Sequence, residues 1–132
     1  MSRYTLRRTL SAPKERVYDF FVDPVAFSHW FVVPGFTTPA DRVRIDARPG
    51  GQIQAVMVSD ADATQVPFVV GFGELAPMEK VVLHPGEGER VTIILTEVPE
   101  GTEIEYQYEG PATGAADIAA TDAMLDLMAA HT

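Results

Sequence analysis

The chain has 132 residues, of which 46% are hydrophobic and 22% charged, as is typical of one folded domain with a single core. Acidic residues outnumber basic ones 19 to 10, which gives a formal net charge of −9. Because this charge repels phosphates and anionic lipids, we expect neither a nucleic acid nor a membrane surface as a partner. The chain contains no cysteine, which excludes disulfides and thiolate chemistry.

The first eight residues are rich in charge and lack the apolar run of a secretory signal peptide. No stretch approaches the roughly 20 consecutive apolar residues that a membrane-spanning helix needs. There is also no internal repeat, low-complexity tract or linker. We therefore expect a cytoplasmic protein in which residues 1–132 form a single domain.

The first two elements are a strand and a helix. Residues 3–10 alternate between apolar and polar positions, apart from one arginine, and this alternation predicts a strand. The next segment predicts the start of a helix, with Ser11 or Ala12 at the N-cap and Pro13 in the first turn. Glu15 favours the same interpretation, since a carboxylate is stabilised at the positive end of the helix dipole.

Asp23 and Pro24 end this first helix, because the residue before a proline is pushed out of the α region. A second short helix is expected over about residues 25–30. Turn signals at short spacing then separate segments with period-two alternation. These segments predict strands at residues 53–58, 66–75, 81–84, 91–97 and 102–109.

The last predicted strand has one apolar and one acidic face. Ile104, Tyr106 and Tyr108 lie on the apolar face, and glutamates fill most of the opposite one. After a break at residues 110–114, the remaining chain predicts an alanine-rich helix of about 16 residues, roughly 24 Å long. This order of elements predicts an α+β fold in which helices lie on one side of a curved antiparallel sheet.

Six short motifs follow one another along nearly the whole chain: residues 10–21, Asp23-Pro24, Trp30-Phe31, Arg48-Pro49-Gly50-Gly51, residues 71–77 and Gly101-Thr102-Glu103-Ile104. With the element order, they make the chain resemble the START-like (SRPBCC) superfamily. Within it, the chain resembles the family named for the activator of the 90-kDa heat-shock protein ATPase. The resemblance implies a helix-grip fold, in which the sheet wraps the long C-terminal helix and leaves a cavity between them. The chain departs from its relatives at residues 114–118, where they often carry a tryptophan.

A hollow is also expected on physical grounds, because a strongly bent sheet does not press its whole concave face onto one helix. Its predicted lining consists of aromatic residues and methionines from the sheet and the helices: Trp30, Met57, Phe68, Phe72, Tyr106, Tyr108, Met124 and Met128. The alternative is that these side chains fill the core and leave no room for a ligand.

Two charged residues fall on core-facing positions of the predicted strands. In an uninterrupted strand, Arg8 would lie on the same face as Leu6 and Leu10, and Glu74 on the same face as Phe72. A buried charge is costly unless it is paired. One hypothesis therefore places Arg8 and Glu74 together as an ion pair in the interior, a polar pole that orients a ligand. The alternatives are a pair at the surface or a strand end, or an alternation that a β-bulge interrupts.

No pattern in the sequence assigns a catalytic residue. His29, His84 and His131 share no metal-ligand spacing, so neither a metal nor another cofactor is expected, and rim or surface positions suit them best. The chain has no nucleophile elbow, phosphate loop or dinucleotide fingerprint.

Three hypotheses about function remain. The favoured one is a module that binds a hydrophobic or aromatic small molecule between the sheet and the C-terminal helix. The second is a cyclase- or aromatase-like enzyme acting on an apolar substrate, as occurs in the superfamily, although the sequence favours binding over turnover. The third is a stress-related protein that contacts a chaperone, as the family name suggests. The sequence leaves a homodimer open.

Overall fold

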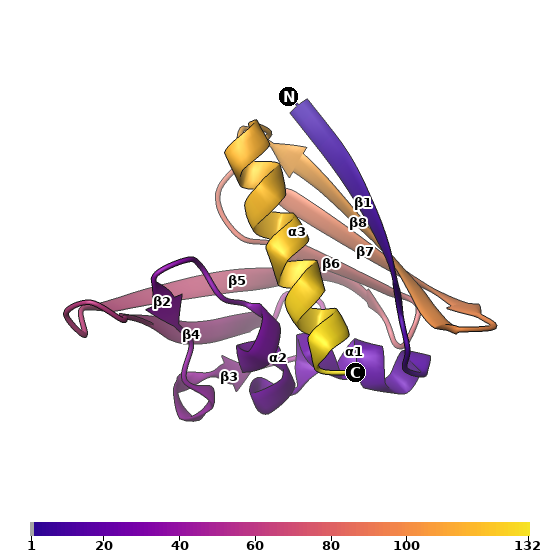
Figure 1. The fold of residues 1–132 in the computed structure, drawn as a ribbon, viewed down its shortest axis with the longest axis horizontal. Coiled ribbons are helices and arrows are strands. Elements are labelled where there is room, and N and C mark those ends of the chain that lie inside the picture. Colours follow the sequence, from indigo (N-terminus) through magenta and orange to yellow (C-terminus); the bar gives the residue numbers. More distant parts are fainter. Residues whose placement is uncertain (1) are drawn as a thin grey trace.

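The structure, a computed structural model, describes residues 2–132. A curved sheet wraps around one long helix that crosses its concave face, and two short helices close one end (Figure 1). The elements in chain order are β1 (Ser2–Leu10), α1 (Lys14–Val22), α2 (Pro24–Trp30), β2 (Phe36–Thr37), a 3-10 turn (Ala40–Arg42), β3 (Arg44–Ile45), β4 (Gln52–Ser59), β5 (Gln65–Ala76), β6 (Lys80–His84), β7 (Arg90–Val98), β8 (Gly101–Gly110) and α3 (Ala115–Ala130).

The eight strands are antiparallel, in the order β1-β8-β7-β6-β5-β4-β2, and β3 also pairs with β4. Strands β4 to β8 form a meander, and β1 joins its far edge beside β8. The predicted α+β helix-grip fold is therefore confirmed. The sequence did not indicate β2 or the separate strand β3, because two residues are too short to show an alternation.

The pairing of β1 with β8 fixes which side chains face α3. Tyr4 lies opposite Tyr108, and Leu6 lies opposite Tyr106. Every second residue of β8 from Thr102 onward is buried, and the residues between them are partly exposed. The two chain ends thus build one concave wall together.

The helices begin and end where local chemistry requires it. Asp23 stops α1 and then caps α2, because its carboxylate accepts a hydrogen bond from the backbone N–H of Ala26 at 2.9 Å. The N-cap expected at Ser11 or Ala12 is wrong: helix α1 begins one residue later, after Pro13. The carbonyl of Ala12 instead accepts a hydrogen bond from the Thr102 hydroxyl at 2.8 Å, which holds this corner against β8.

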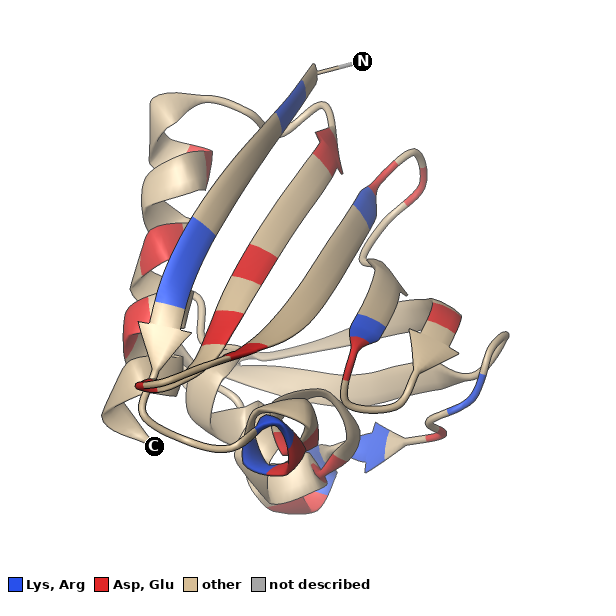
Figure 2. Ribbon diagram, turned by 90° about the vertical axis from the view of Figure 1, so that its right-hand side faces the viewer, with Lys and Arg blue, Asp and Glu red and all other residues tan. Residues whose placement is uncertain are grey.

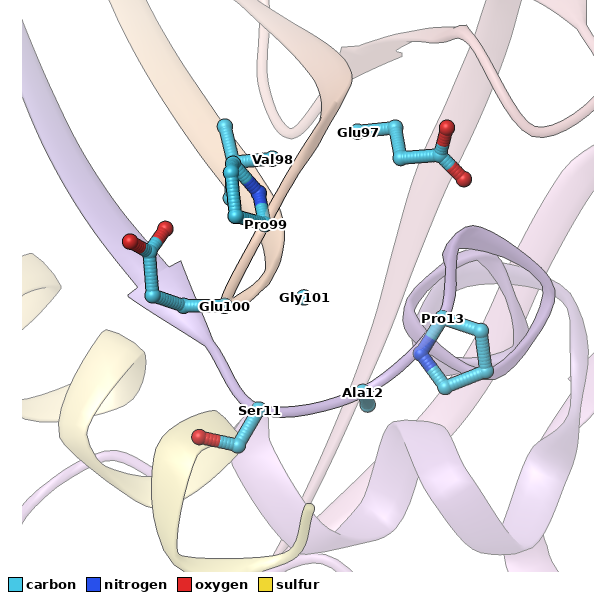
Figure 3. A pocket seen from close by; sticks show the side chains of 8 residues that line it. All are labelled: Ser11, Ala12, Pro13, Glu97, Val98, Pro99, Glu100 and Gly101. Atoms are coloured by element: carbon cyan, nitrogen blue, oxygen red, sulfur yellow. The ribbon is translucent and has the colours of Figure 1, made fainter.

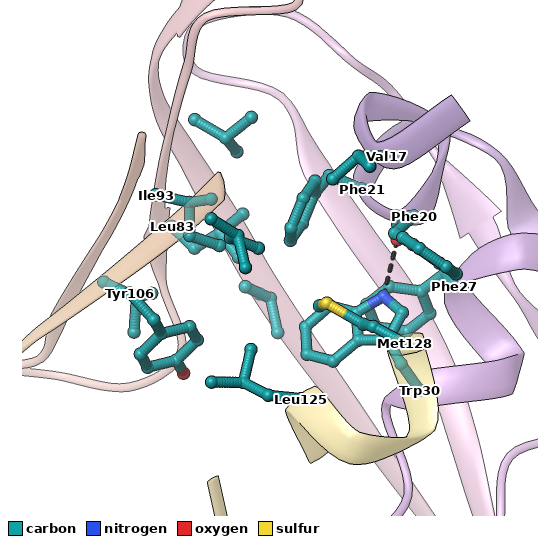
Figure 4. Packing of buried hydrophobic residues seen from close by; sticks show 14 of the residues in the cluster. Val17, Phe20, Phe21, Phe27, Trp30, Leu83, Ile93, Tyr106, Leu125 and Met128 are labelled. Carbon is teal, nitrogen blue, oxygen red and sulfur yellow. Dashed lines mark hydrogen bonds between the residues drawn. The ribbon is translucent and has the colours of Figure 1, made fainter. Parts of the chain in front are cut away.

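Trp30 lies at the centre of the core, where α2 meets the sheet (Figure 4). Its ring makes edge contacts with Phe21 and Phe27, each at 5.5 Å between ring centroids. Its indole N–H donates a hydrogen bond to the carbonyl of Phe20 at 2.7 Å, so the polar atom of this buried ring is satisfied.

Helix α3 packs mainly against β1 and α2. Thr121, Leu125 and Met128 are its buried residues, and their spacing places them on one face of the helix. The helix therefore closes over the β1 side of the concave sheet. The hairpin of β4 and β5 extends beyond it on the other side (Figure 1).

Candidate functional site

The concave interior brings together side chains from every layer of the fold. Trp30 comes from α2, Tyr106 from β8, and Leu125 and Met128 from α3 (Figure 4). Phe72, from β5, belongs to the same buried cluster. Five of the residues predicted from the sequence therefore lie in the common core: Trp30, Phe72, Tyr106, Tyr108 and Met128.

A group of three hydroxyls lies under the first half of α3, and we call Tyr4, Tyr106 and Thr121 the hydroxyl cluster. The oxygens of Tyr4 and Thr121 are 2.7 Å apart. The Thr121 hydroxyl also donates to the backbone carbonyl of Asp117 at 3.3 Å, so the Tyr4 hydroxyl must be the donor toward Thr121. The cluster joins the first strand to the last helix, across 117 residues of sequence.

Burial raises the pKa of the Tyr106 hydroxyl well above its ordinary value, because the phenolate is poorly solvated there. The neighbouring Tyr4, Glu89 and Tyr108 add to this effect, and only the nearby Thr121 hydroxyl acts in the opposite direction. Burial likewise raises the pKa of Tyr4. Both phenols are therefore neutral groups at physiological pH.

The Tyr106 hydroxyl has an unusual environment for a residue that is only 9% exposed. Within residues 2–132 its oxygen makes no side-chain hydrogen bond of 3.5 Å or shorter, and its hydrogen-bonding neighbour is the Thr121 hydroxyl, which lowers its pKa. Over the same residues, no polar side-chain atom is both sealed from solvent and unpaired. The Tyr106 oxygen therefore borders space that a water molecule can reach, and the ring points it toward Leu125 (Figure 4).

Tyr108 belongs to the same wall, but its hydroxyl is already occupied. The ring stacks on that of Tyr4, with 5.2 Å between the centroids. The hydroxyl donates to the carboxylate of Glu89 and accepts the backbone N–H of Ala112 at 3.1 Å. Burial, together with the Glu89 carboxylate, raises its pKa. Tyr108 thus ties the end of β8 to the loop before β7.

The side of the interior that faces away from β1 is formed by a row of stacked rings. Phe31, at the end of α2, stacks on Phe27 and on Phe68, with 5.0 Å between centroids in each case. Phe31 and Phe68 are both only half-buried. The apolar wall therefore reaches solvent along this edge.

Met57 lies further out along the hairpin of β4 and β5. It pairs across the strands with Val66, which is 37% exposed. Met57 is half-buried and shares the inner face of the sheet with Phe68. It extends the same apolar surface without being part of the buried core.

The two charged residues predicted at core positions do not meet. A register shift between Phe72 and Leu75 interrupts the alternation of β5, which turns Glu74 outward. Its carboxylate lies 3.4 Å from the ammonium of Lys80 on the next strand. The hypothesis of a pole formed by Arg8 and Glu74 is therefore wrong, and the β-bulge is the reason.

Arg8 does face α3, as its parity indicated, but two carboxylates of that helix neutralise it. The guanidinium contacts Asp126 and lies 2.6 Å from a carboxylate oxygen of Asp122. Acidic positions on α3 run alongside the basic positions of β1 (Figure 2). Because Arg8 is 25% exposed, these ion pairs lie at the rim of the interior and fasten the helix to the first strand.

A separate cleft of about 690 Å³ lies outside the sheet, where the β7–β8 hairpin meets the start of α1 (Figure 3). Residues 11–13 and 97–101 line it, with the carboxylates of Glu97 and Glu100 among them. The cleft is broad and open to solvent, so it does not exclude water from a small apolar molecule. It is a weaker candidate for such a ligand than the interior.

The three histidines lie away from the hydroxyl cluster. His29 and His131 stack at 4.4 Å where α2 meets the end of α3, and His84 lies beside the carbonyl of Glu89. Within residues 2–132 no three histidine, aspartate or glutamate side chains are grouped as metal ligands. No helix in this part of the chain is long and apolar enough to cross a bilayer.

The arrangement of the sheet and α3 matches that of known proteins. The family model described as "Activator of Hsp90 ATPase homolog 1-like protein" matches residues 11–129. The chain belongs to this family. The resemblance inferred from the sequence motifs is thereby confirmed.

Solved structures share the fold over almost the whole chain. Protein CV1439 from Chromobacterium violaceum is 29% identical, with a TM-score of 0.83, and the match covers 100% of this chain and 98% of that one. An AHSA1-like protein from Aeromonas hydrophila is 16% identical, with a TM-score of 0.86 and coverage of 98% and 91%. An AHSA1 protein from Silicibacter pomeroyi is 17% identical, with a TM-score of 0.76 and coverage of 98% and 96%. No curated protein matches the chain.

Sequence reasoning missed three residues of the interior. Tyr4 had a usable signal, since it alternates with charged residues in the first strand. Phe31 belongs to the Trp30-Phe31 motif, but nothing in its spacing showed that it stacks on Phe68. Thr121 gave no signal, because one threonine in an alanine-rich helix shows its partner only when the helix is placed on the sheet.

Proposed function

We propose that the protein binds a neutral, apolar small molecule in the concave interior, between the sheet and α3. Within residues 2–132, the buried polar side chains besides the tyrosines and Trp30 are the threonines Thr38, Thr102 and Thr121, and no charged side chain is buried. Such an environment disfavours a charged ligand and suits an apolar one.

The observation that carries the proposal is the incomplete closure of the interior. The half-buried rings of Phe31 and Phe68 and the half-buried Met124 leave apolar surface at the edge of α3, and the Tyr106 hydroxyl borders accessible space deeper inside. A fully packed core leaves neither feature. The hollow itself stays a prediction, and the family membership supports it.

The neutral probe N-phenyl-1-naphthylamine tests this proposal, because its fluorescence rises in apolar surroundings. Trp30 is the single tryptophan of the chain, so energy transfer from it reports a probe bound nearby. We expect saturable binding of one probe per chain. A titration without saturation, or without energy transfer from Trp30, would contradict the proposal.

Introducing a charge at the open edge is expected to weaken this binding. Met124→Arg places a guanidinium at a half-buried position of α3 that packs against the core, and we expect the dissociation constant for the probe to rise about ten-fold or more, because the bound probe hinders hydration of the charge. Met78→Arg is the matched control on the exposed turn between β5 and β6, where Met78 is 38% exposed. The control is expected to bind like the unmodified protein. Equal effects of both substitutions would place the probe elsewhere.

A further inference from the structure

Within residues 2–132, the Tyr106 hydroxyl is the one donor of the hydroxyl cluster that makes no hydrogen bond of 3.5 Å or shorter, although the Thr121 hydroxyl lies near enough to lower its pKa. The Tyr4 hydroxyl donates to Thr121, and Thr121 donates to the carbonyl of Asp117. On the same wall, the hydroxyl of Tyr108 donates to Glu89. Tyr106 is left with a proton that no bond of ordinary length engages in residues 2–132, and its oxygen is not sealed from solvent.

The surroundings of this donor are apolar. Tyr106 lies between Leu6 of β1 and Ile93 of β7 in the sheet, and its hydroxyl points toward Leu125 of α3 (Figure 4). A hydrogen bond made there is shielded from competing water, so its effect on affinity is larger than at an exposed site. One unpaired donor in an apolar wall is the pattern by which pockets orient an otherwise apolar ligand.

The charge of the ligand follows from the nearby groups. Burial raises the pKa of Tyr106, so the phenol keeps its proton and acts as a donor at physiological pH. A ligand carboxylate would need a cation, but Arg8, the arginine of β1 that faces α3, is already paired with Asp122 and Asp126. Glu89 and Asp117 add negative charge around the cluster, which further disfavours an anion. A neutral acceptor oxygen meets these conditions.

We propose that Tyr106 donates a hydrogen bond to a carbonyl oxygen of the ligand, so that the site selects neutral ketones, or similar carbonyl compounds, with an apolar body. This inference rests on the proposed function and adds the chemical class of the ligand. Tyr4 and Thr121 take a positioning role, because their mutual hydrogen bond leaves the Tyr106 proton free for the ligand.

Two probes of nearly the same shape separate the hydrogen bond from the apolar contacts. 2-Acetylnaphthalene carries a ketone, and 2-isopropenylnaphthalene has a methylene group in place of the oxygen. Their dissociation constants are to be measured by isothermal titration calorimetry. With the unmodified protein we expect the ketone to bind about 5- to 10-fold more tightly, as one shielded hydrogen bond allows.

The Tyr106→Phe variant removes only the hydroxyl oxygen. We expect it to bind both probes with equal affinity, at the level of 2-isopropenylnaphthalene on the unmodified protein. Tyr18→Phe, on α1, is the matched control and should keep the preference for the ketone. Circular dichroism checks that each variant is folded.

The outcomes of this experiment are distinct. A ketone preference that Tyr106→Phe abolishes supports the inference. If both probes bind equally to the unmodified protein, or if the preference survives in Tyr106→Phe, the inference is wrong and the apolar site remains. If neither probe binds, the proposed function fails together with the inference.

Discussion

Replacing Trp30 by alanine is expected to lower the free energy of unfolding by about 3–5 kcal/mol. The ring is 1% exposed, and its contacts with Phe21 and Phe27 join α1 and α2 to the core. Its removal leaves a cavity and also strips the carbonyl of Phe20 of its hydrogen bond. Because the only tryptophan is lost, urea unfolding should be followed by far-UV circular dichroism.

The exposed residue Val25 provides the control on the same helix. Its side chain is 54% exposed, so Val25→Ala should change the free energy of unfolding by less than about 0.5 kcal/mol. A loss of less than about 1 kcal/mol in Trp30→Ala would show that α2 is not packed as described.

Gly101→Ala is the second substitution with a large expected effect, about 2–4 kcal/mol of lost stability. Gly101 starts β8 with a φ of +143°, and an added Cβ would lie 2.1 Å from the carbonyl oxygen of Leu10 and 2.9 Å from the backbone nitrogen of Ala12. These are backbone atoms of the corner between β1 and α1, so they have little freedom to move away. Thermal and urea unfolding both measure the loss.

A second glycine with a positive φ serves as the control, because alanine there meets the unfavourable backbone conformation without a steric clash. Gly88, in the loop before β7, has a φ of +76°, but no atom lies within 4 Å of the position that an added Cβ would take. Gly88→Ala should therefore cost only about 1 kcal/mol. If both alanine variants lose the same stability, the tight approach of β8 to this corner is not as described.

The residues that the sequence predicted well are those whose environment follows from local alternation. Tyr106 and Tyr108 face the interior because β8 alternates without interruption, and Trp30 is buried because it closes the apolar face of a short helix. Glu74 broke the same rule, because a bulge between Phe72 and Leu75 reverses the alternation of the strand, and the sequence offered this bulge only as an alternative. Arg8 faced α3 as expected, but its partners, Asp122 and Asp126, lie more than 110 residues away in sequence.

The candidate site was therefore predictable as a set of side chains and not as a geometry. Alternation in the strands indicated which aromatic rings point inward. The hydroxyl cluster depends on where α3 crosses the sheet, and that is decided by packing between segments far apart in the chain. No local pattern contains this information.

The location of a bound probe is the most direct test of the interior site. Labelling the methionine methyl groups with ¹³C provides reporters at Met124 and Met128 on α3, at Met57 on the hairpin, and at Met78 on an exposed turn. On addition of 2-acetylnaphthalene, we expect the signals of Met124 and Met128 to shift saturably while that of Met78 stays in place. Unchanged signals from both helix methionines, or a shift confined to Met78, would contradict binding between the sheet and α3.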